Sequence, residues 1–87
     1  MTRVKFKKSK NPYTNEYEVI CVFVDDVWTF PDKAEKMQNC YVHDGQHSHG
    51  MKEYFDHLLY ATEEEYAPLL KELTEIVGYD DLEIIHG

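Results

Sequence analysis

The fold of this chain is decided by residues 17–24, which read Tyr17-Glu18-Val19-Ile20-Cys21-Val22-Phe23-Val24. The stretch is almost continuously apolar and rich in β-branched side chains, which favour an extended backbone in a pleated sheet. Because nearly every position is apolar, rather than every second one, we expect both faces of this strand to be at least partly covered. The stretch therefore predicts a central strand of a β-sheet.

The segment before this strand predicts a second strand paired with it. Residues 2–8 alternate, with Val4 and Phe6 on one side and basic side chains on the other, which is the period of a half-buried strand. Residues 9–16 contain Asn-Pro and Thr-Asn pairs, whose backbone preferences suit turns. Together these patterns predict a β-hairpin.

The middle of the chain has shorter patterns. Residues 25–36 resist periodic assignment and predict a loop. Residues 37–43 predict a third strand, which ends at the turn dipeptide Asp44-Gly45. From residue 48 to residue 60, apolar side chains recur at spacings of three and four, which predicts a short helix with Ser48 as its N-cap.

The clearest element is a helix in the C-terminal half. Thr62 and Glu65 have the spacing of a capping box, in which each side chain accepts a hydrogen bond from the other residue's backbone. Gly78 stands where helix C-termini favour glycine, so we expect the helix to run from about Glu63 to Val77. Its apolar positions, at helical spacing, are Tyr66, Leu69, Leu70, Leu73, Ile76 and Val77. Residues 82–85 predict a terminal strand.

These elements predict one α+β domain spanning residues 1–87. A chain of 87 residues with 43% hydrophobic content is long enough for one core and too short for two. We expect a mainly antiparallel sheet of three or four strands, with the C-terminal-half helix packed on one face and the short helix beside it. Cys21 and Cys40 both lie in apolar stretches, which predicts buried thiols in a reducing cytoplasm.

The charge distribution restricts the partners and the location. The net charge is −8, yet five of the nine basic residues fall in the first ten positions, so the rest of the chain is strongly acidic. Such a body repels phosphates, which makes nucleic acid an unfavourable partner, although it could attract basic ones. A solvated acidic surface is the simpler interpretation. No apolar run approaches the roughly 18 residues of a membrane span, so we expect no membrane contact.

A cluster of histidines around the predicted third strand is the candidate chemical site. Cys40, His43, His47 and His49 could supply the thiolate and imidazole ligands that zinc prefers. The spacing lacks the paired ligands of ordinary structural zinc sites, so our first interpretation has no cofactor and zinc is the alternative. In the first interpretation Asp44-Gly45 turns the chain, and Gln46 and His47 satisfy loop backbone groups. A nucleophilic Cys40 or Ser48 would need an orienting third group, which the sequence does not display.

The aromatic residues are more numerous than a core of this size can hide. Tyrosine and tryptophan are enriched at protein interfaces, so some of them suit a partner-binding or homodimer surface. Trp28 and Phe30, in the predicted loop, are the leading anchors. With His43, Gln46 and His47 they form our set of candidate binding residues.

The C-terminal half resembles a family. The residues that carry the resemblance are 40–48, with the Gly-Gln-His-Ser segment, the Thr-capped start at 61–66, and the stretches 69–73 and 78–85. They are similar to small uncharacterised proteins of bacteriophages and mobile elements of gut bacteria. In those proteins a Gly-Gln-His-Ser segment also precedes a short helix and a Thr-capped helix. The resemblance implies the order of elements and no known activity.

From these observations we expect a non-enzymatic accessory protein of phage or mobile-element origin. It would bind another macromolecule, first of all a protein, in the cytoplasm of a bacterial host. A second copy of the chain is the other partner that the aromatic surplus allows. The alternative is a metal-binding protein or small metalloenzyme centred on residues 40–49.

Overall fold

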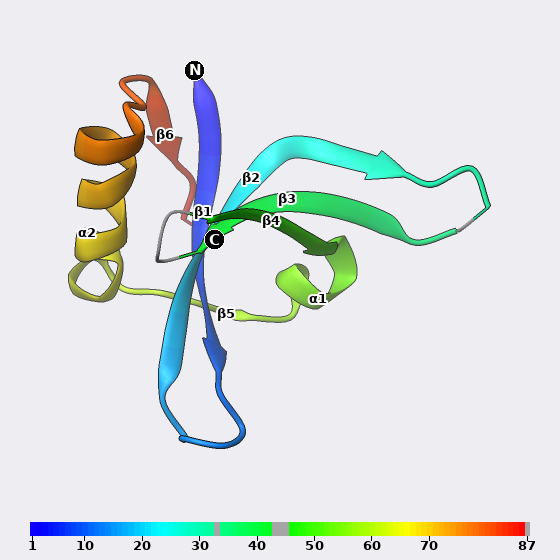
Figure 1. Cartoon of the computed structure of the whole chain (residues 1–87), viewed down its shortest axis with the longest axis horizontal. Helices are drawn as coiled ribbons and strands as arrows, with labels where there is room; N and C mark the ends of the chain where they lie inside the picture. The colour runs from blue at the N-terminus through cyan, green and yellow to red at the C-terminus, as the bar shows by residue number, and fades with distance from the viewer. Residues whose placement is uncertain (33, 43–45, 87) are drawn as a thin grey trace.

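The computed structural model describes residues 1–32, 34–42 and 46–86 (Figure 1). The elements are β1 (Thr2–Lys10), β2 (Tyr17–Thr29), β3 (Lys36–Val42), β4 (Gln46–Met51), α1 (Lys52–Asp56), β5 (Leu59–Tyr60), α2 (Glu63–Glu72), the π-helical turn η1 (Leu73–Val77) and β6 (Leu82–Ile84). The fold is α+β, as the sequence predicts.

The sheet is built on an antiparallel meander of four strands in the order β4-β3-β2-β1. Two short strands extend it beyond the expected three or four. Both pair with the outer edge of β1: β5 runs antiparallel to it and β6 parallel to it. Strand β2 is therefore central, because β1 pairs with its residues 17–23 on one side and β3 pairs with residues 20–22 and 27–29 on the other.

Helices α1 and α2 stand on opposite sides of the sheet (Figure 1). We call the two sheet faces the α2 face and the α1 face. The core on the α2 face contains Val4, Phe6, Cys21, Phe23, Tyr41, Ala61, Tyr66, Leu69 and Leu73. The core on the α1 face contains Ile20, Val22, Cys40 and Phe55. Both faces of β2 are thus covered over residues 20–23, whereas Tyr17 and Glu18 are exposed. The prediction of two buried free thiols is confirmed.

The C-terminal helix begins and ends where the sequence predicts. The capping box is complete, since Thr62 accepts from the Glu65 N–H and Glu65 accepts from the Thr62 N–H. The Thr62 N–H and the Lys8 ammonium group hold the pKa of Glu65 below its usual value. Gly78 ends the helix with a φ of 97°, the left-handed conformation that glycine adopts at little cost.

The last five helical residues differ from the predicted amphipathic pattern. They form a π-turn, in which each hydrogen bond spans one residue more than in an α-helix. The wider turn rotates the following side chains away from the core. Leu73 is fully buried, whereas Ile76 is 79% exposed and Val77 is also exposed. The expectation that Ile76 and Val77 belong to the buried face is therefore wrong.

Two further local predictions are wrong. Residues 25–29 continue β2 instead of forming a loop, because a β-bulge between Val22 and Val27 restores pairing with β3. Residues 46–51 form β4, although the sequence predicts loop residues at Gln46 and His47 and a helix from Ser48. Ser48 therefore caps no helix, and α1 begins only at Lys52. Pairing with β3 along the whole of β4 supplies the backbone hydrogen bonds that a helix would otherwise have made.

Gly50 allows helix α1 to pack closely against strand β4. A Cβ atom at Gly50 would lie 2.9 Å from the ring of Phe55, closer than carbon atoms approach without displacement. Glycine therefore lets the buried Phe55 ring lie directly on β4. Within the described ranges, none of the helices has the length and apolar character needed to cross a bilayer.

Candidate functional site

The α2 face of the sheet extends beyond the helix that names it. Figure 1 shows α2 at one end of the sheet, with the β2–β3 hairpin reaching away from it. Cross-strand pairing places six side chains on this outlying part: Trp28, Met37, Asn39, His47, His49 and Met51. We call this set the open face. Its members are exposed or half-buried, in contrast to the core beneath α2.

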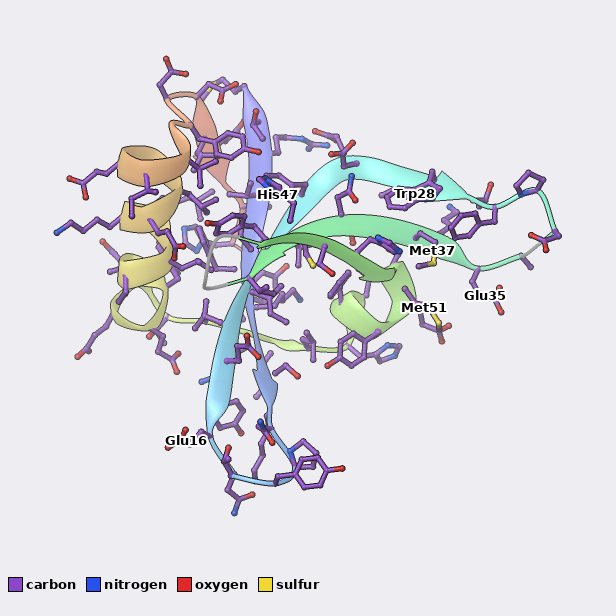
Figure 2. All side chains as sticks on the ribbon, viewed as in Figure 1. Glu16, Trp28, Glu35, Met37, His47 and Met51 are labelled. Carbon is purple, nitrogen blue, oxygen red and sulfur yellow. The ribbon has the colours of Figure 1, made fainter. Side chains whose placement is uncertain are left out.

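Trp28 is the central aromatic side chain of the open face. Its ring meets the His49 ring edge-on at a centroid distance of 5.7 Å and the Phe30 ring at 6.4 Å. Figure 2 shows Trp28, Met37 and Met51 on three neighbouring strands in this region. The structure thus brings two predicted anchors, Trp28 and Phe30, into contact with each other and with a predicted metal ligand.

His47 lies where the open face meets the core. Its ring is 5.0 Å from that of Tyr41 and 6.0 Å from that of Phe23, measured between centroids. Its Nε2 atom is 3.2 Å from the Tyr79 hydroxyl. Burial, followed by nearby acidic groups, raises the pKa of Tyr79, so this phenol stays protonated at neutral pH. His47 is therefore fixed in place by aromatic contacts and one polar contact.

Two open grooves adjoin the open face. One, of about 430 Å³, is lined by Phe30, Asp32, Ala34, Glu35, Met37 and Met51. The other, of about 180 Å³, is lined by Phe23, Asp26, Asn39, His47, Ser48, His49 and Tyr79. In the second, the Asn39 amide donates to the Asp26 carboxylate at 3.2 Å. Both grooves combine apolar or aromatic walls with carboxylates, which suits a cationic side chain with an apolar stem.

A further groove lies between the β1–β2 hairpin and α2. It also has a volume of about 430 Å³ and is lined by Asn11, Thr14, Glu16, Tyr17, Glu18, Val19, Glu65, Pro68 and Leu69. The Glu65 carboxylate at its wall is already held by the Thr62 N–H and the Lys8 ammonium group. The Glu65 carboxylate therefore already stabilises the fold and is less available to a ligand in this groove.

The three proposed zinc ligands that the structure describes do not lie on one face of the sheet. Cys40 lies in the core of the α1 face, whereas His47 and His49 lie on the α2 face. Burial raises the pKa of Cys40, which disfavours the thiolate that a metal requires. His43 and the Gln46 side chain lie outside the described parts of the structure. Among the residues that are described, no three His, Cys, Asp or Glu side chains form a ligand group.

Several basic side chains of β1 make contacts within the molecule. Lys7, only 5% exposed, donates to the Leu58 carbonyl at 3.1 Å, and its ammonium group lies 3.8 Å from the centre of the Tyr60 ring. Arg3 pairs with Asp25. These contacts reduce the positive surface that phosphates could meet.

Half of the open face could not be predicted from the sequence. Met37 lies opposite Trp28 because β3 pairs with β2, and Asn39 and Met51 join the two histidines because residues 46–51 form a strand beside β3. Residues 36–42 do not alternate between apolar and polar types, so no local signal indicated which of them share a face. No family model, curated protein or solved structure matches the chain, so the geometry of the open face alone bears on function.

Proposed function

We propose that this chain is a non-enzymatic accessory protein that binds another protein through the open face. The observation that carries the proposal is Trp28, half-buried between Phe30 and His49 on an exposed part of the sheet. Tryptophan is among the residues that contribute most to binding at protein interfaces. The resemblance of the C-terminal half favours a role in a bacteriophage or mobile element within a bacterial host cell.

Charge complementarity indicates which partner surface would fit. Asp32 and Glu35 line the groove beside Met37 and Met51, and Asp26 lines the other groove. A partner that presents lysine or arginine next to apolar side chains would pair with these carboxylates and bury its apolar stem against the methionines. The net charge of −8 would speed the approach of such a partner at low salt.

The cysteines give no support to an enzymatic alternative based on a thiol nucleophile. Burial raises the pKa of Cys21 to about 12, and that of Cys40 is also raised. A thiol must ionise to attack, so neither cysteine is prepared for covalent chemistry at neutral pH.

Replacing Trp28 with alanine is expected to weaken partner binding by about 30-fold or more, the effect of removing an interface anchor. The partner would first be captured by crosslinking in a bacterial lysate and identified by mass spectrometry, and its affinity for each variant would then be measured by calorimetry. Tyr13→Ala is the matched control, because Tyr13 is 95% exposed on the distant β1–β2 turn. Equal binding by both variants would refute the assignment of the open face.

Zinc binding stays a prediction from the sequence. It would now have to use His47 or His49 together with His43, without Cys40, because Cys40 lies on the other face of the sheet. Native mass spectrometry of untagged protein purified without chelator tests it. One zinc per chain that disappears in His43→Ala would support the metal site, and a metal-free spectrum would reject it.

A further inference from the structure

One side of the sheet ends in an unpaired strand. Strand β4 is the last in the order β4-β3-β2-β1, and β3 is the one strand paired with it among the described residues. The other side is different, because β5 and β6 together cover much of the outer edge of β1. A free edge presents a row of backbone N–H and C=O groups that another extended chain can satisfy.

The hydrogen bonds on β1 establish which backbone groups face which way. In an antiparallel sheet, each residue directs its N–H and C=O to one side, and successive residues alternate. The Ala61 N–H donates to the Phe6 carbonyl at 2.9 Å, and the Ile85 N–H donates to the Val4 carbonyl at 2.8 Å. Val4 and Phe6 therefore face away from β2. The intervening Lys5 must face β2, where it pairs with Val22.

The same alternation carries across to β4. Because Val22 bonds to β1, its neighbour Cys21 bonds to β3, where it pairs with Tyr41. Cys40, next to Tyr41, must then bond to β4, where it pairs with Ser48. The backbone groups of Ser48 and Gly50 thus face β3. Those of His47 and His49 face outward, as does the Met51 N–H, whereas the Met51 carbonyl accepts the first hydrogen bond of α1 as its N-cap.

This edge lacks the features by which monomeric proteins protect exposed strands. Its sequence, residues 46–51, contains no lysine, proline or carboxylate, although 30% of the chain is charged. Lysines and prolines on an edge normally discourage pairing with another molecule. Strand β4 is therefore a region along which two acidic bodies could approach with little charge repulsion.

We propose that β4 pairs with β4 of a second copy of this chain, antiparallel and about a twofold axis at His49. This register places His47 opposite Met51 of the partner subunit and His49 opposite His49 of the partner subunit. The His49 pair exchanges two backbone hydrogen bonds, because both groups of each His49 face outward. Each His47–Met51 pair contributes one, from the Met51 N–H to the His47 carbonyl, because the Met51 carbonyl already accepts from α1. The axis is perpendicular to the sheet, so the two open faces join on the same side.

The proposed dimer interface would be small and its affinity weak. A strand pair of this length buries less than the roughly 1,200 Å² of a standard interface, so we expect a dissociation constant on the order of 10 µM. Met51, 43% exposed at the end of β4, would add side-chain contact at each end of the pair. Sedimentation equilibrium from about 5 to about 500 µM spans the expected transition.

Proline at position 49 is the decisive variant. His49→Pro removes an N–H that faces outward, so it leaves the pairing of β4 with β3 intact, and prolines are tolerated on edge strands for this reason. We expect it to weaken dimerisation at least tenfold. His49→Ala is the matched control, since it removes the same ring but keeps the N–H, and its dimer should remain within about threefold of the unsubstituted protein.

His49→Lys provides a second variant in case proline disturbs folding. It leaves the backbone unchanged and places two like charges across the axis, so it should also give monomer. Far-UV circular dichroism would confirm that each variant is folded.

Amide hydrogen exchange supplies an independent measurement. The amides of Ser48 and Gly50 should be protected at every concentration, because they bond to β3. Those of His49 and Met51 should become protected only as the dimer forms.

An unsubstituted protein that stays monomeric to about 500 µM would overturn the proposal, as would a His49→Pro dimer of unchanged affinity. A monomer whose β4 amides become protected only on adding an extended peptide would assign the edge to a foreign strand instead. Because the dimer uses the edge and partner binding uses Trp28, Trp28→Ala should leave the dimer intact. The two proposals can therefore fail separately.

Discussion

Replacing Leu73 with alanine is expected to lower the free energy of unfolding by about 3 kcal/mol, within the range measured for buried leucines. Leu73 has no exposed surface and lies in the core between α2 and the sheet. The substitution removes several buried carbon atoms and leaves a cavity that a sheet and a capped helix cannot easily fill. Urea unfolding followed by circular dichroism measures the change, and the thermal midpoint should fall by about 10 °C or more.

The control for this variant lies three residues further along the same turn. Ile76 is 79% exposed, so Ile76→Ala should change the free energy of unfolding by no more than about 0.5 kcal/mol. A regular α-helix with the apolar pattern of this sequence would make both positions part of the core. Similar losses of unfolding free energy in the two variants would therefore contradict the π-turn and indicate a regular α-helix instead.

Replacing Gln38 with glutamate is expected to lower the free energy of unfolding by about 3 kcal/mol or more at neutral pH. Gln38 is 4% exposed, and its Nε2 atom donates to the carbonyls of Phe23 and Val24 at 3.1 and 3.3 Å, beside the bulge in β2. Its Oε1 atom is the buried side-chain oxygen without a partner among the described residues. Glutamate would place a buried negative charge against two carbonyl oxygens.

The pH dependence of this variant has a definite sign. Burial and the facing carbonyls would raise the pKa of the new carboxyl group in the folded state above its unfolded value. The folded state then binds the proton more tightly than the unfolded state. The loss of unfolding free energy relative to the unsubstituted protein should therefore shrink as the pH falls from about 7 to about 5. Urea unfolding at both pH values, with the unsubstituted protein as reference, measures this change.

Gln38→Met is the matched control, because it removes both donors without adding a charge. It should lower the free energy of unfolding by about 1 to 3 kcal/mol, by the same amount at both pH values. If the loss of unfolding free energy in Gln38→Glu is also independent of pH, the new carboxyl group reaches solvent, contrary to the burial of this position.

The open face illustrates how far the sequence could lead. Trp28, Phe30 and His47 were selected for their residue types alone, and the structure places them in or beside one exposed region of the sheet. Cys40 was grouped with His47 and His49 because they are close in sequence. Strand alternation separates them, since Cys40 pairs with Ser48 while His47 pairs with Tyr41.

The error over β4 has a particular cause. Met51, Tyr54, Phe55 and Leu58 recur at helical spacing, and the helix they predict does form, but only over Lys52–Asp56. The preceding residues satisfy their backbone groups on β3, a neighbour that no local pattern identifies. The expected loop at 25–36 is wrong over residues 25–29 for the same reason, because the bulge that returns β2 to its pairing depends on β3. The described residues between Thr29 and Lys36 do lie outside the strands.

The sequence by itself determined the features that depend on neighbours within a few positions. These are the alternation of β1, the apolar run of β2, and the helix that starts at Thr62 and ends at Gly78, where capping and glycine conformation act locally. Only the tertiary structure decided the length of β2, the existence of β4, the burial of Leu73 rather than Ile76, and the side of the sheet each histidine faces. Those features depend on backbone pairing and packing between segments distant in sequence, which residue type and spacing do not specify.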